Sequence, residues 1–327
     1  MVYQDYWFTL PIDALFLEIY TQLMEMVHIP VIYQDHYLLA VNKPAGLVIH
    51  PTYKHADGTM WDAILALLAC QEQESWTPPR PPDKPEWAQA PLEVQAMLRQ
   101  KMYERIEREE GLLPRPCLLH RLDKDTSGVV LLARTERSRR FLVKQFEERS
   151  IQKSYLAVVS RGAPEWTRPR TACTVSISQN RELVPLEGSP DQVICQGCEF
   201  VIQGPLGRDP EDYRRCVVIE GGQDALTACT VLAVERGFAL LNVHPITGRT
   251  HQIRAHLAAI GWAIVGDQLY ATEQAKQLGL TRQFLHARSI TVRHYPEKQE
   301  RTFVAPLSLD LQDWLQREMP AGSRALE

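Results

Sequence analysis

Residues 120–133 read HRLDKDTSGVVLLA, and they place the densest polar cluster of the chain directly before an apolar run. The run from Gly128 to Ala133 predicts a buried strand, which makes the preceding polar residues a loop at the mouth of that strand. Side chains in such a loop are available to a cleft while the strand fixes their position. The alternative is a structural turn at 126–128, in which Asp123 only satisfies nearby donors. The rest of the sequence is needed to distinguish a functional loop from a structural turn.

Three known sequence motifs were compared with this cluster, and none matches. A kinase catalytic loop begins His-Arg-Asp, but here Leu122 intervenes and no G-x-G-x-x-G loop precedes it. Aspartic proteases need two Asp-Thr/Ser-Gly turns, and the residues from Asp125 to Gly128 do not form one. A phosphate-binding G-x-x-x-x-G-K loop is absent from the sequence.

Outward from this cluster, apolar periodicity predicts strands and helices in mixed order. Because strands and helices do not alternate strictly, the pattern favours an α+β fold with a mixed sheet. The last three expected strands look adjacent and antiparallel. The expected strands are 28–33, 37–41, 128–133, 153–159, 216–220, 227–234 and 238–243, and the expected helices are 12–27, 60–69, one that Thr135 caps and 249–260.

The segment 71–116 differs in composition from its surroundings. Six prolines between Thr77 and Leu92 remove amide donors, so no packed element is expected there. Residues 92–110 are helix-prone and charged. The stretch from Gln71 to Pro114 holds nine acidic and six basic residues. We therefore expect an acidic surface insertion that stays outside any active site.

Composition and charge exclude several classes of protein. The 327 residues are 45% hydrophobic and 23% charged, which is typical of a soluble globular protein. The net charge of −4 gives no overall attraction to polyanions, but 115–154 holds ten basic and five acidic residues, a local basic patch. Seven cysteines, no positively charged start and no long apolar run predict a cytoplasmic protein with reduced thiols and no membrane span.

A second polar cluster, HPITGRTHQIRAHL, covers residues 244–257. Its three histidines suggest a metal, but His251 and His256 are five residues apart and no carboxylate lies at ligand spacing. A solvated helix face is the alternative. The C-x-x-C at 195–198 lacks two further ligands, so it predicts structural or incidental thiols. We expect no metal.

Together these stretches resemble the RluA family of RNA pseudouridine synthases, with the matches in family order. The family signature H-R-L-D-x-x-T-S-G is complete at 120–128. The other matching segments are N-K-P-A-G at 42–46, K-S-Y-L at 153–156, G-R-T-H-Q-I-R-x-H at 248–256, G-D-x-x-Y at 266–270 and L-H-A at 285–287.

The resemblance implies a fold and an organisation. The fold is a mixed, mostly antiparallel curved sheet with flanking helices and a cleft across it. The catalytic domain is expected at 29–315 with the insertion at 71–116, after an N-terminal helical extension at 1–28 and before a flexible tail at 316–327. A monomer that needs no cofactor is expected, acting on structured RNA, either transfer or ribosomal.

The resemblance also implies residue roles. Asp123 starts the reaction, either by attacking the anomeric carbon of the ribose or by removing its 2′ proton, and Arg254 holds this carboxylate through two hydrogen bonds. Tyr155 lies against the uracil and helps remove the proton on carbon 5, although a phenol with a pKa near about 10 is a weak base. The implied substrate-binding residues are Arg121, His120, Leu285, Lys43, Arg249 and Gln252.

A uracil inside folded RNA is stacked, so it must be flipped out before its glycosidic bond is reached. Arg121 is expected to fill the gap, because a planar cation suits both bases and phosphates; an ion pair with a neighbouring acid is the alternative. Two rival functions stay open. One is a non-catalytic RNA-binding or RNA-folding protein that keeps the pocket, and the other is a glycosylase that releases uracil.

Overall fold

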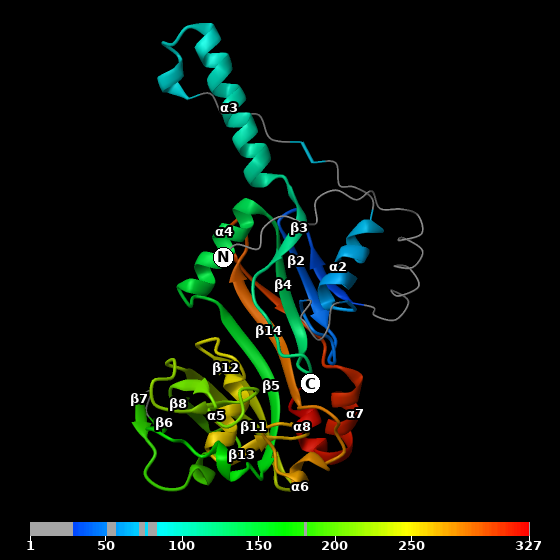
Figure 1. Cartoon of the computed structure of the whole chain (residues 1–327), viewed down its shortest axis with the longest axis vertical. Coiled ribbons are helices and arrows are strands. Elements are labelled where there is room, and N and C mark those ends of the chain that lie inside the picture. The colour runs from blue at the N-terminus through cyan, green and yellow to red at the C-terminus, as the bar shows by residue number, and fades with distance from the viewer. Residues whose placement is uncertain (1–28, 51–56, 72–75, 78–83, 180–181, 327) are drawn as a thin grey trace.

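The computed structural model describes residues 29–50, 57–71, 76–77, 84–179 and 182–326 (Figure 1). Its described part is built around one large sheet and one two-stranded sheet, β9 (Leu206–Arg208) with β10 (Cys216–Val218). The large sheet comprises thirteen described strands. They are β1 (Val31–Gln34), β2 (Leu38–Lys43), β3 (Leu112–Leu118), β4 (Ser127–Thr135), β5 (Gln152–Arg161), β6 (Thr174–Gln179), β7 (Glu182–Pro185), β8 (Glu199–Gln203), β11 (Leu226–Glu235), β12 (Phe238–Pro245), β13 (Trp262–Ile264), β14 (Leu285–Arg293) and β15 (Glu300–Val304).

The strand order is β1-β2-β4-β14-β5-β12-β11-β8-β6-β7, with β3 on β4, β13 on β5 and β15 on β14. The pairs are antiparallel apart from β4 with β14, where Ser127 lies opposite His286 and Gly128 opposite Ala287. This confirms the predicted α+β fold with a mixed, mostly antiparallel sheet. The β4–β14 approach depends on Gly128, because its φ is +124° and a Cβ there would lie 2.3 Å from the Ala287 carbonyl oxygen.

Helices flank both halves of the sheet. The two largest buried apolar clusters of the described residues lie one mainly on β1, β2 and β4 and one mainly on β5, β11 and β12, and Tyr155 packs against both. The helices are α2 (Met60–Ala69), α3 (Leu92–Glu110), α4 (Glu136–Glu147), α5 (Gln252–Ala259), α6 (Glu273–Lys276), α7 (Leu309–Glu318) and α8 (Pro320–Arg324), with 3-10 turns at Pro85–Trp87, Glu165–Thr167 and Pro190–Val193. None of the described helices has the length and apolarity needed to cross a bilayer.

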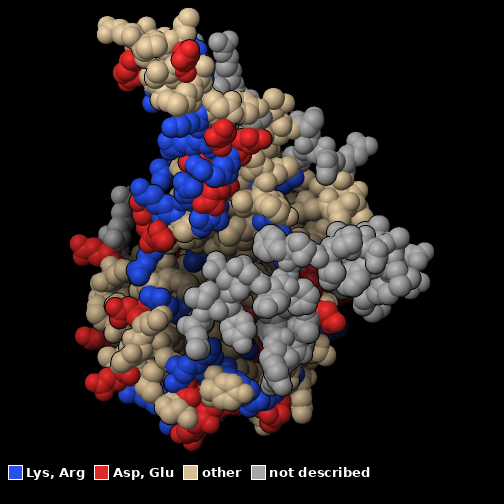
Figure 2. Space-filling model, turned by 45° about the horizontal axis from the view of Figure 1, so that its top comes forward, with Lys and Arg blue, Asp and Glu red and all other residues tan. Residues whose placement is uncertain are grey.

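Helix α3 projects from the body as an arm (Figure 1). In α3 only Glu109 is buried. Its carboxylate forms ion pairs with Arg105 (3.1 Å) and Arg137 (3.4 Å). Figure 2 accordingly shows basic and acidic side chains intermixed where the arm joins the body. The segment that carries α3 leaves the body and rejoins it at neighbouring points. Trp76 precedes this segment and Gly111 follows it, and a Cβ on Gly111 would lie 3.9 Å from the Trp76 ring.

Two predicted boundaries are wrong. Residues 112–116, assigned to the insertion, belong to β3, which pairs with β4. The tail at 316–327 is not flexible over 316–326, because α7 and α8 continue through it, Met319 is fully buried and the Ala321 amide donates to Glu235 (2.9 Å). The helical extension at 1–28 lies outside the described residues.

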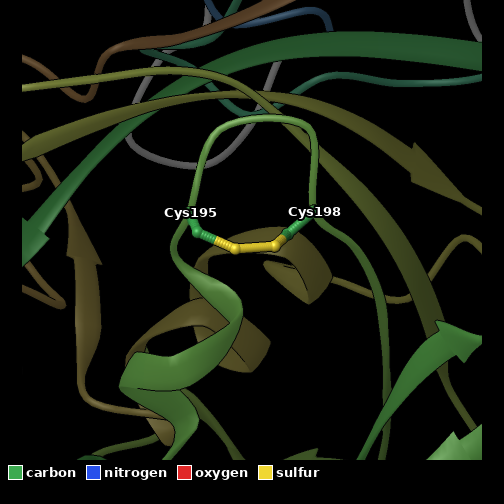
Figure 3. Close-up of a disulfide and its surroundings, with 2 residues drawn as sticks. All are labelled: Cys195 and Cys198. Atoms are coloured by element: carbon green, nitrogen blue, oxygen red, sulfur yellow. A yellow bond between two sulfur atoms is a disulfide. The ribbon is translucent and has the colours of Figure 1, made fainter.

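Three smaller expectations also need correction. Strand β10 pairs with β9 and not with β11, although β11 and β12 are antiparallel neighbours as predicted. Helix α5 begins at Gln252, three residues later than expected. Cys195 and Cys198 are joined by a disulfide at the start of β8 (Figure 3), where reduced thiols were expected.

Candidate active site

A pocket of about 490 Å³ opens near the middle of the large sheet, between the β4–β14 side and the β5–β12 side. It is lined by the loop before β4, the end of α4 with the turn after it, β5, the segment 245–254 and the start of β14. Motifs far apart in the sequence therefore converge on one cavity. The predicted site residues that line it are His120, Arg121, Asp123, Tyr155, Arg249, Gln252, Arg254 and Leu285.

The centre of the pocket is a carboxylate held by a buried cation. Arg254 Nη1 donates to Asp123 Oδ2 at 2.9 Å. The pair of hydrogen bonds expected between Arg254 and Asp123 is formed with Asp267 instead. Arg254 Nε donates to Asp267 Oδ2 (2.7 Å) and Nη2 donates to Oδ1 (2.9 Å). Only one guanidinium nitrogen is therefore left for Asp123, whose side chain is 23% exposed.

Asp267 is the anchor of this arrangement. Its side chain is fully buried, and Oδ1 also accepts the amides of Leu269 and Tyr270 at 2.9 and 3.0 Å. Burial alone would raise the pKa of Asp267, but Arg254 and these amides outweigh it and hold the pKa below its usual value. Asp267 thus stays ionised and fixes the guanidinium. The sequence contained the signal, G-D-x-x-Y, but the prediction gave Asp267 no role.

Lys43 supports the loop and does not face the pocket. Its side chain is fully buried, and Nζ donates to the carbonyls of Pro44, Lys124 and Thr126 at 2.9, 2.8 and 3.0 Å. Burial lowers the pKa of Lys43 to about 7, against the opposing effect of Asp125 and Asp123. This geometry does not favour the expected role in substrate binding. It suits a lysine that fixes the backbone around Asp123.

Tyr155 and Leu285 supply apolar surface beside Asp123. Strand β5 carries Tyr155 and the neighbouring β14 begins at Leu285, so pairing of the two strands sets the spacing of these side chains. Burial, reinforced by the charge of Asp123, raises the pKa of the Tyr155 phenol. At neutral pH this side chain is therefore a neutral hydroxyl.

His120 and Arg121 differ in their surroundings. His120 Nε2 accepts the Leu131 amide (3.1 Å), its ring stacks on Phe146 at 5.4 Å, and burial together with Lys153 lowers its pKa to about 3. His120 is therefore a neutral ring that joins the loop to β4. Arg121 is exposed at the pocket and forms no ion pair with any described residue.

The amide of Gln252 is fully used within the protein. Its Oε1 accepts the Thr247 hydroxyl (2.7 Å) and the Arg249 amide (2.9 Å), while Nε2 donates to the Leu226 carbonyl (2.9 Å) and the Thr227 hydroxyl (3.0 Å). Gln252 thus holds the turn before α5 and has no spare group for a ligand. Arg249 Nε donates to a backbone carbonyl at residue 224 (3.2 Å).

His251 also lines the pocket, and the prediction gave it no role beyond rejecting it as a metal ligand. Its Nε2 lies 3.8 Å from Asp123 Oδ2, and Nδ1 lies 3.1 Å from the Tyr270 hydroxyl. His256 is fully buried between Thr227 and the Gly204 carbonyl, so 252–259 is not a solvated helix face. Within the described ranges, no three His, Cys, Asp or Glu side chains are grouped as a metal site would require.

Comparisons with known proteins point to one family. The sequence profile described as RNA pseudouridylate synthase matches residues 37–259. An uncharacterized RNA pseudouridine synthase of Chloroflexus aurantiacus is 33% identical over 83% of this chain and 63% of its own length. Ribosomal large subunit pseudouridine synthase D of Xanthomonas campestris pv. campestris is 30% identical over 91% of this chain and 71% of its own length. The chain thus spans just under two thirds of the Chloroflexus protein.

The fold has a counterpart among solved structures. Human RNA pseudouridylate synthase domain containing 4 is similar with a TM-score of 0.51 and 22% identity, over 92% of this chain and 95% of that chain. At this identity the likeness concerns the fold, and it agrees with the mixed sheet described above.

Proposed function

Because the chain belongs to the RluA family of RNA pseudouridine synthases, we propose that it isomerises specific uridines in structured RNA to pseudouridine. The observation that carries the proposal is the Asp123 carboxylate, held at 2.9 Å by Arg254 inside a pocket of about 490 Å³. A pocket that only docked RNA would not need a partly buried carboxylate with a fixed cation beside it. The non-catalytic alternative is therefore the less favoured one.

Asp123 is the group that starts the reaction in this proposal. Its Oδ2 accepts from Arg254, while Oδ1 accepts no hydrogen bond from any described residue. A carboxylate oxygen with free lone pairs can attack the anomeric carbon or remove the 2′ proton of a bound ribose. Arg254 holds the carboxylate in one orientation, and Asp267 keeps Arg254 in place. The isomerisation needs neither a metal nor a cofactor.

The uracil is proposed to lie between Tyr155 and Leu285. Both side chains line the pocket beside Asp123, and together they offer an aromatic and an aliphatic surface to the two faces of a base. Arg121, exposed at the pocket and without an ionic partner among the described residues, is proposed to fill the space that the flipped base leaves.

The proposed partner is a structured RNA, either ribosomal or transfer. The segment 115–154 supports this, because three of its basic residues, Arg121, Arg149 and Lys153, line the pocket and can meet phosphates there. The Xanthomonas relative carries the large ribosomal subunit in its name, so ribosomal RNA is the first substrate to test.

The test is to map pseudouridines in cells with and without this protein. Carbodiimide adducts on pseudouridine block reverse transcription, so a modified position appears as a stop. We expect at least one stop in ribosomal or transfer RNA to disappear when the gene is deleted and to return with the wild-type chain but not with an Asp123→Asn chain. Identical stops in both cells, or restoration by the variant, would contradict the proposal. Free uracil among the products would favour the glycosylase.

A further inference from the structure

A hairpin outside the large sheet carries an unusually exposed tyrosine. The hairpin consists of β9 and β10, which pair antiparallel with Arg208 opposite Cys216, and of the tip 209–215 that joins them. Tyr213 lies in this tip and is 74% exposed. Every other Phe, Tyr or Trp that the structure describes is buried or half-buried. Because exposed aromatic rings are typical of binding surfaces, the tip is a candidate contact site.

Ion pairs and a covered ring hold the tip in place. The Asp209 side chain is fully buried, with Arg170 Nη2 3.1 Å from Oδ1 and Arg215 Nε 3.0 Å from Oδ2. The Arg215 guanidinium also covers the Trp166 ring, 3.9 Å from its centroid. The Asp209 amide donates to the Arg215 carbonyl (3.1 Å) and closes the tip. Tyr213 therefore extends from an ordered backbone, so a ligand can bind its ring at little cost in conformational entropy.

The base of the hairpin is attached to the active site. The Cys216 amide donates to the Tyr270 hydroxyl (2.7 Å), which donates to the Cys216 carbonyl (3.0 Å). The Tyr270 ring faces the Arg254 guanidinium, 5.0 Å from the ring centroid, and Arg254 donates to Asp123 (2.9 Å). Since Arg208 pairs with Cys216 across the hairpin, β9 ends next to these site residues. The hairpin is thus fixed relative to the pocket.

Arg208 supplies a positive charge beside the tip. Its Nη1 donates to the Tyr213 carbonyl (2.9 Å), the residue is exposed, and it forms no ion pair with any described residue. Arg214 differs, because Asp212 accepts from its guanidinium at 2.6 and 2.9 Å. Burial is the main cause that lowers the pKa of His251 in the pocket, and the charge of Arg208 contributes to this decrease. Arg208 therefore contacts the tip and lies within electrostatic reach of the pocket.

The other residues of the tip leave this ring and this charge available. Residues 208–215 read RDPEDYRR, so Tyr213 is surrounded by charged residues and a proline and is not part of a wide apolar patch. A protein partner would need such a patch. The acidic side chains of the tip do not neutralise Arg208, because they form ion pairs with Arg170, Arg214 and Arg215.

A nucleotide carries both chemical groups that this arrangement can bind. Its base stacks on an aromatic ring, whichever base it is, and its phosphate is an anion that a guanidinium binds. When a uridine is flipped out of a stack, the bases beside it lose a stacking partner. An aromatic ring next to the pocket can take the place of that partner.

We propose that Tyr213 stacks on an unpaired base next to the target uridine and that Arg208 binds the phosphate of the same nucleotide, an inference that rests on the proposed pseudouridine synthesis. In a continuous A-form helix each base is paired and stacked on both sides, so it offers no free face to the tip. Bases in loops, bulges and single strands do offer one. The subsite therefore predicts a substrate class, namely uridines in unpaired loops and not in duplexes.

The first test measures RNA binding and turnover by the full chain on a stem-loop that contains the mapped uridine. Tyr213→Ala should raise Kd about 10-fold or more, as the loss of a base–aromatic stack does, with kcat nearly unchanged. Tyr213→Phe keeps the ring and should bind like wild type. Leu309 is the matched control, because it is 75% exposed and lies outside the pocket lining, so Leu309→Ala should also bind like wild type.

Abasic nucleotides identify the base that Tyr213 contacts. Each loop position other than the target is made abasic in turn, and Kd is measured for wild type and for Tyr213→Ala. At one position beside the target, loss of the base should weaken wild-type binding by the same factor as Tyr213→Ala does. The same RNA should not weaken binding of Tyr213→Ala any further, because the ring and the base act as one pair.

The phosphate contact has its own measurement. For Arg208→Gln the slope of log Kd against log salt should become shallower by about 0.7, the value for one phosphate contact to a single strand. Arg214→Gln is the matched control, since Asp212 already neutralises that guanidinium, and it should keep the wild-type slope.

Four results would overturn the inference. They are a wild-type Kd for Tyr213→Ala, a Kd for Tyr213→Phe as weak as that for Tyr213→Ala, abasic effects that are equal in the two proteins at every position, and equal salt slopes for Arg208→Gln and wild type. Should Tyr213→Ala fail to fold, Tyr213→Leu takes its place in the same comparison. A wild-type chain that forms no pseudouridine in this RNA would refute the proposed function, whereas the Kd values would still decide whether Tyr213 binds a base.

Discussion

Replacing Arg254 by glutamine removes the cation that two carboxylates share, and the two losses are expected to be unequal. Asp267 is fully buried and receives two hydrogen bonds from the guanidinium, whereas Asp123 is 23% exposed and receives one. Breaking a buried ion pair costs about 3–5 kcal/mol. Two backbone amides still bond to Asp267, so we expect the lower end of that range.

This loss of unfolding free energy can be converted into a decrease in Tm. An unfolding entropy of roughly 2.1 cal/mol/K per residue gives about 0.7 kcal/mol/K for a chain of this length, so a loss of about 3 kcal/mol lowers Tm by roughly 4 °C. Asp123→Asn leaves Arg254 paired with Asp267 and should cost about 1 kcal/mol or less. The activity of Arg254→Gln should fall about 100-fold, because Asp123, the carboxylate proposed to react, loses its fixed donor.

Calorimetry on double-mutant cycles separates these contributions. The coupling free energy of Arg254 with Asp267 should be about 2–3 kcal/mol, and that with Asp123 below about 1 kcal/mol. Arg254→Lys is the matched control, since it keeps the charge but lacks the planar fork that reaches both carboxylates. A Tm for Arg254→Gln within 1 °C of wild type, or the reverse order of couplings, would refute the reasoning.

Two further predictions concern the support of the site, and a third concerns the segment that carries α3. Lys43→Met leaves buried carbonyls of the 123–126 loop without a donor, so stability should fall by about 2–3 kcal/mol and kcat by at least about 10-fold, with RNA Kd nearly unchanged in filter binding. Gly128→Ala should lower the free energy of unfolding by about 3 kcal/mol, because its Cβ would overlap the Ala287 carbonyl at 2.3 Å; a wild-type urea midpoint would argue against this close approach. Replacing 77–108 by a short Gly-Ser linker should keep Tm and activity on a minimal stem-loop while additional uridines become modified, and loss of activity on the stem-loop would show that the arm belongs to the core.

Periodicity and capping residues predicted most of the elements. Helix α3 begins at Leu92 and ends at Glu110 as expected, and Thr135 caps α4. Strand β3 was missed because 112–116 was assigned to the insertion, and its two prolines, Pro114 and Pro116, are unusual inside a strand. The structure accommodates them because the ladder with β4 is irregular between Leu112 and Cys117, so neither proline interrupts a regular pair.

The C-terminal helices were not expected at 316–327. Pro320 and Gly322 are residue types that disfavour a helix interior. In the structure Pro320 occupies the first turn of α8, where its missing amide is harmless, and Gly322 allows close packing on Leu315 and Leu240. Both residues therefore have a structural role that a local reading of the sequence does not reveal.

The site was predictable in its members but not in its connections. The motifs identified Asp123, Tyr155 and Arg254, which come from separate elements and line one pocket. No sequence pattern indicated that Arg254 would grip Asp267 with two bonds and Asp123 with one. The left-handed backbone of His251 depends on the tertiary contacts around α5, so its direction toward Asp123 could not be read from the motif either.

The most direct test of the central claim follows the hydrogen on carbon 5 of uridine during turnover. Ribosomal RNA labelled with tritium at that position is incubated with the purified wild-type chain and, in parallel, with Asp123→Asn. The account predicts tritium release and an equal amount of pseudouridine with the wild type, and neither with the variant, although the two proteins bind the RNA within a few-fold of each other. Release at a comparable rate by Asp123→Asn would contradict the assignment of Asp123 as the group that starts the reaction.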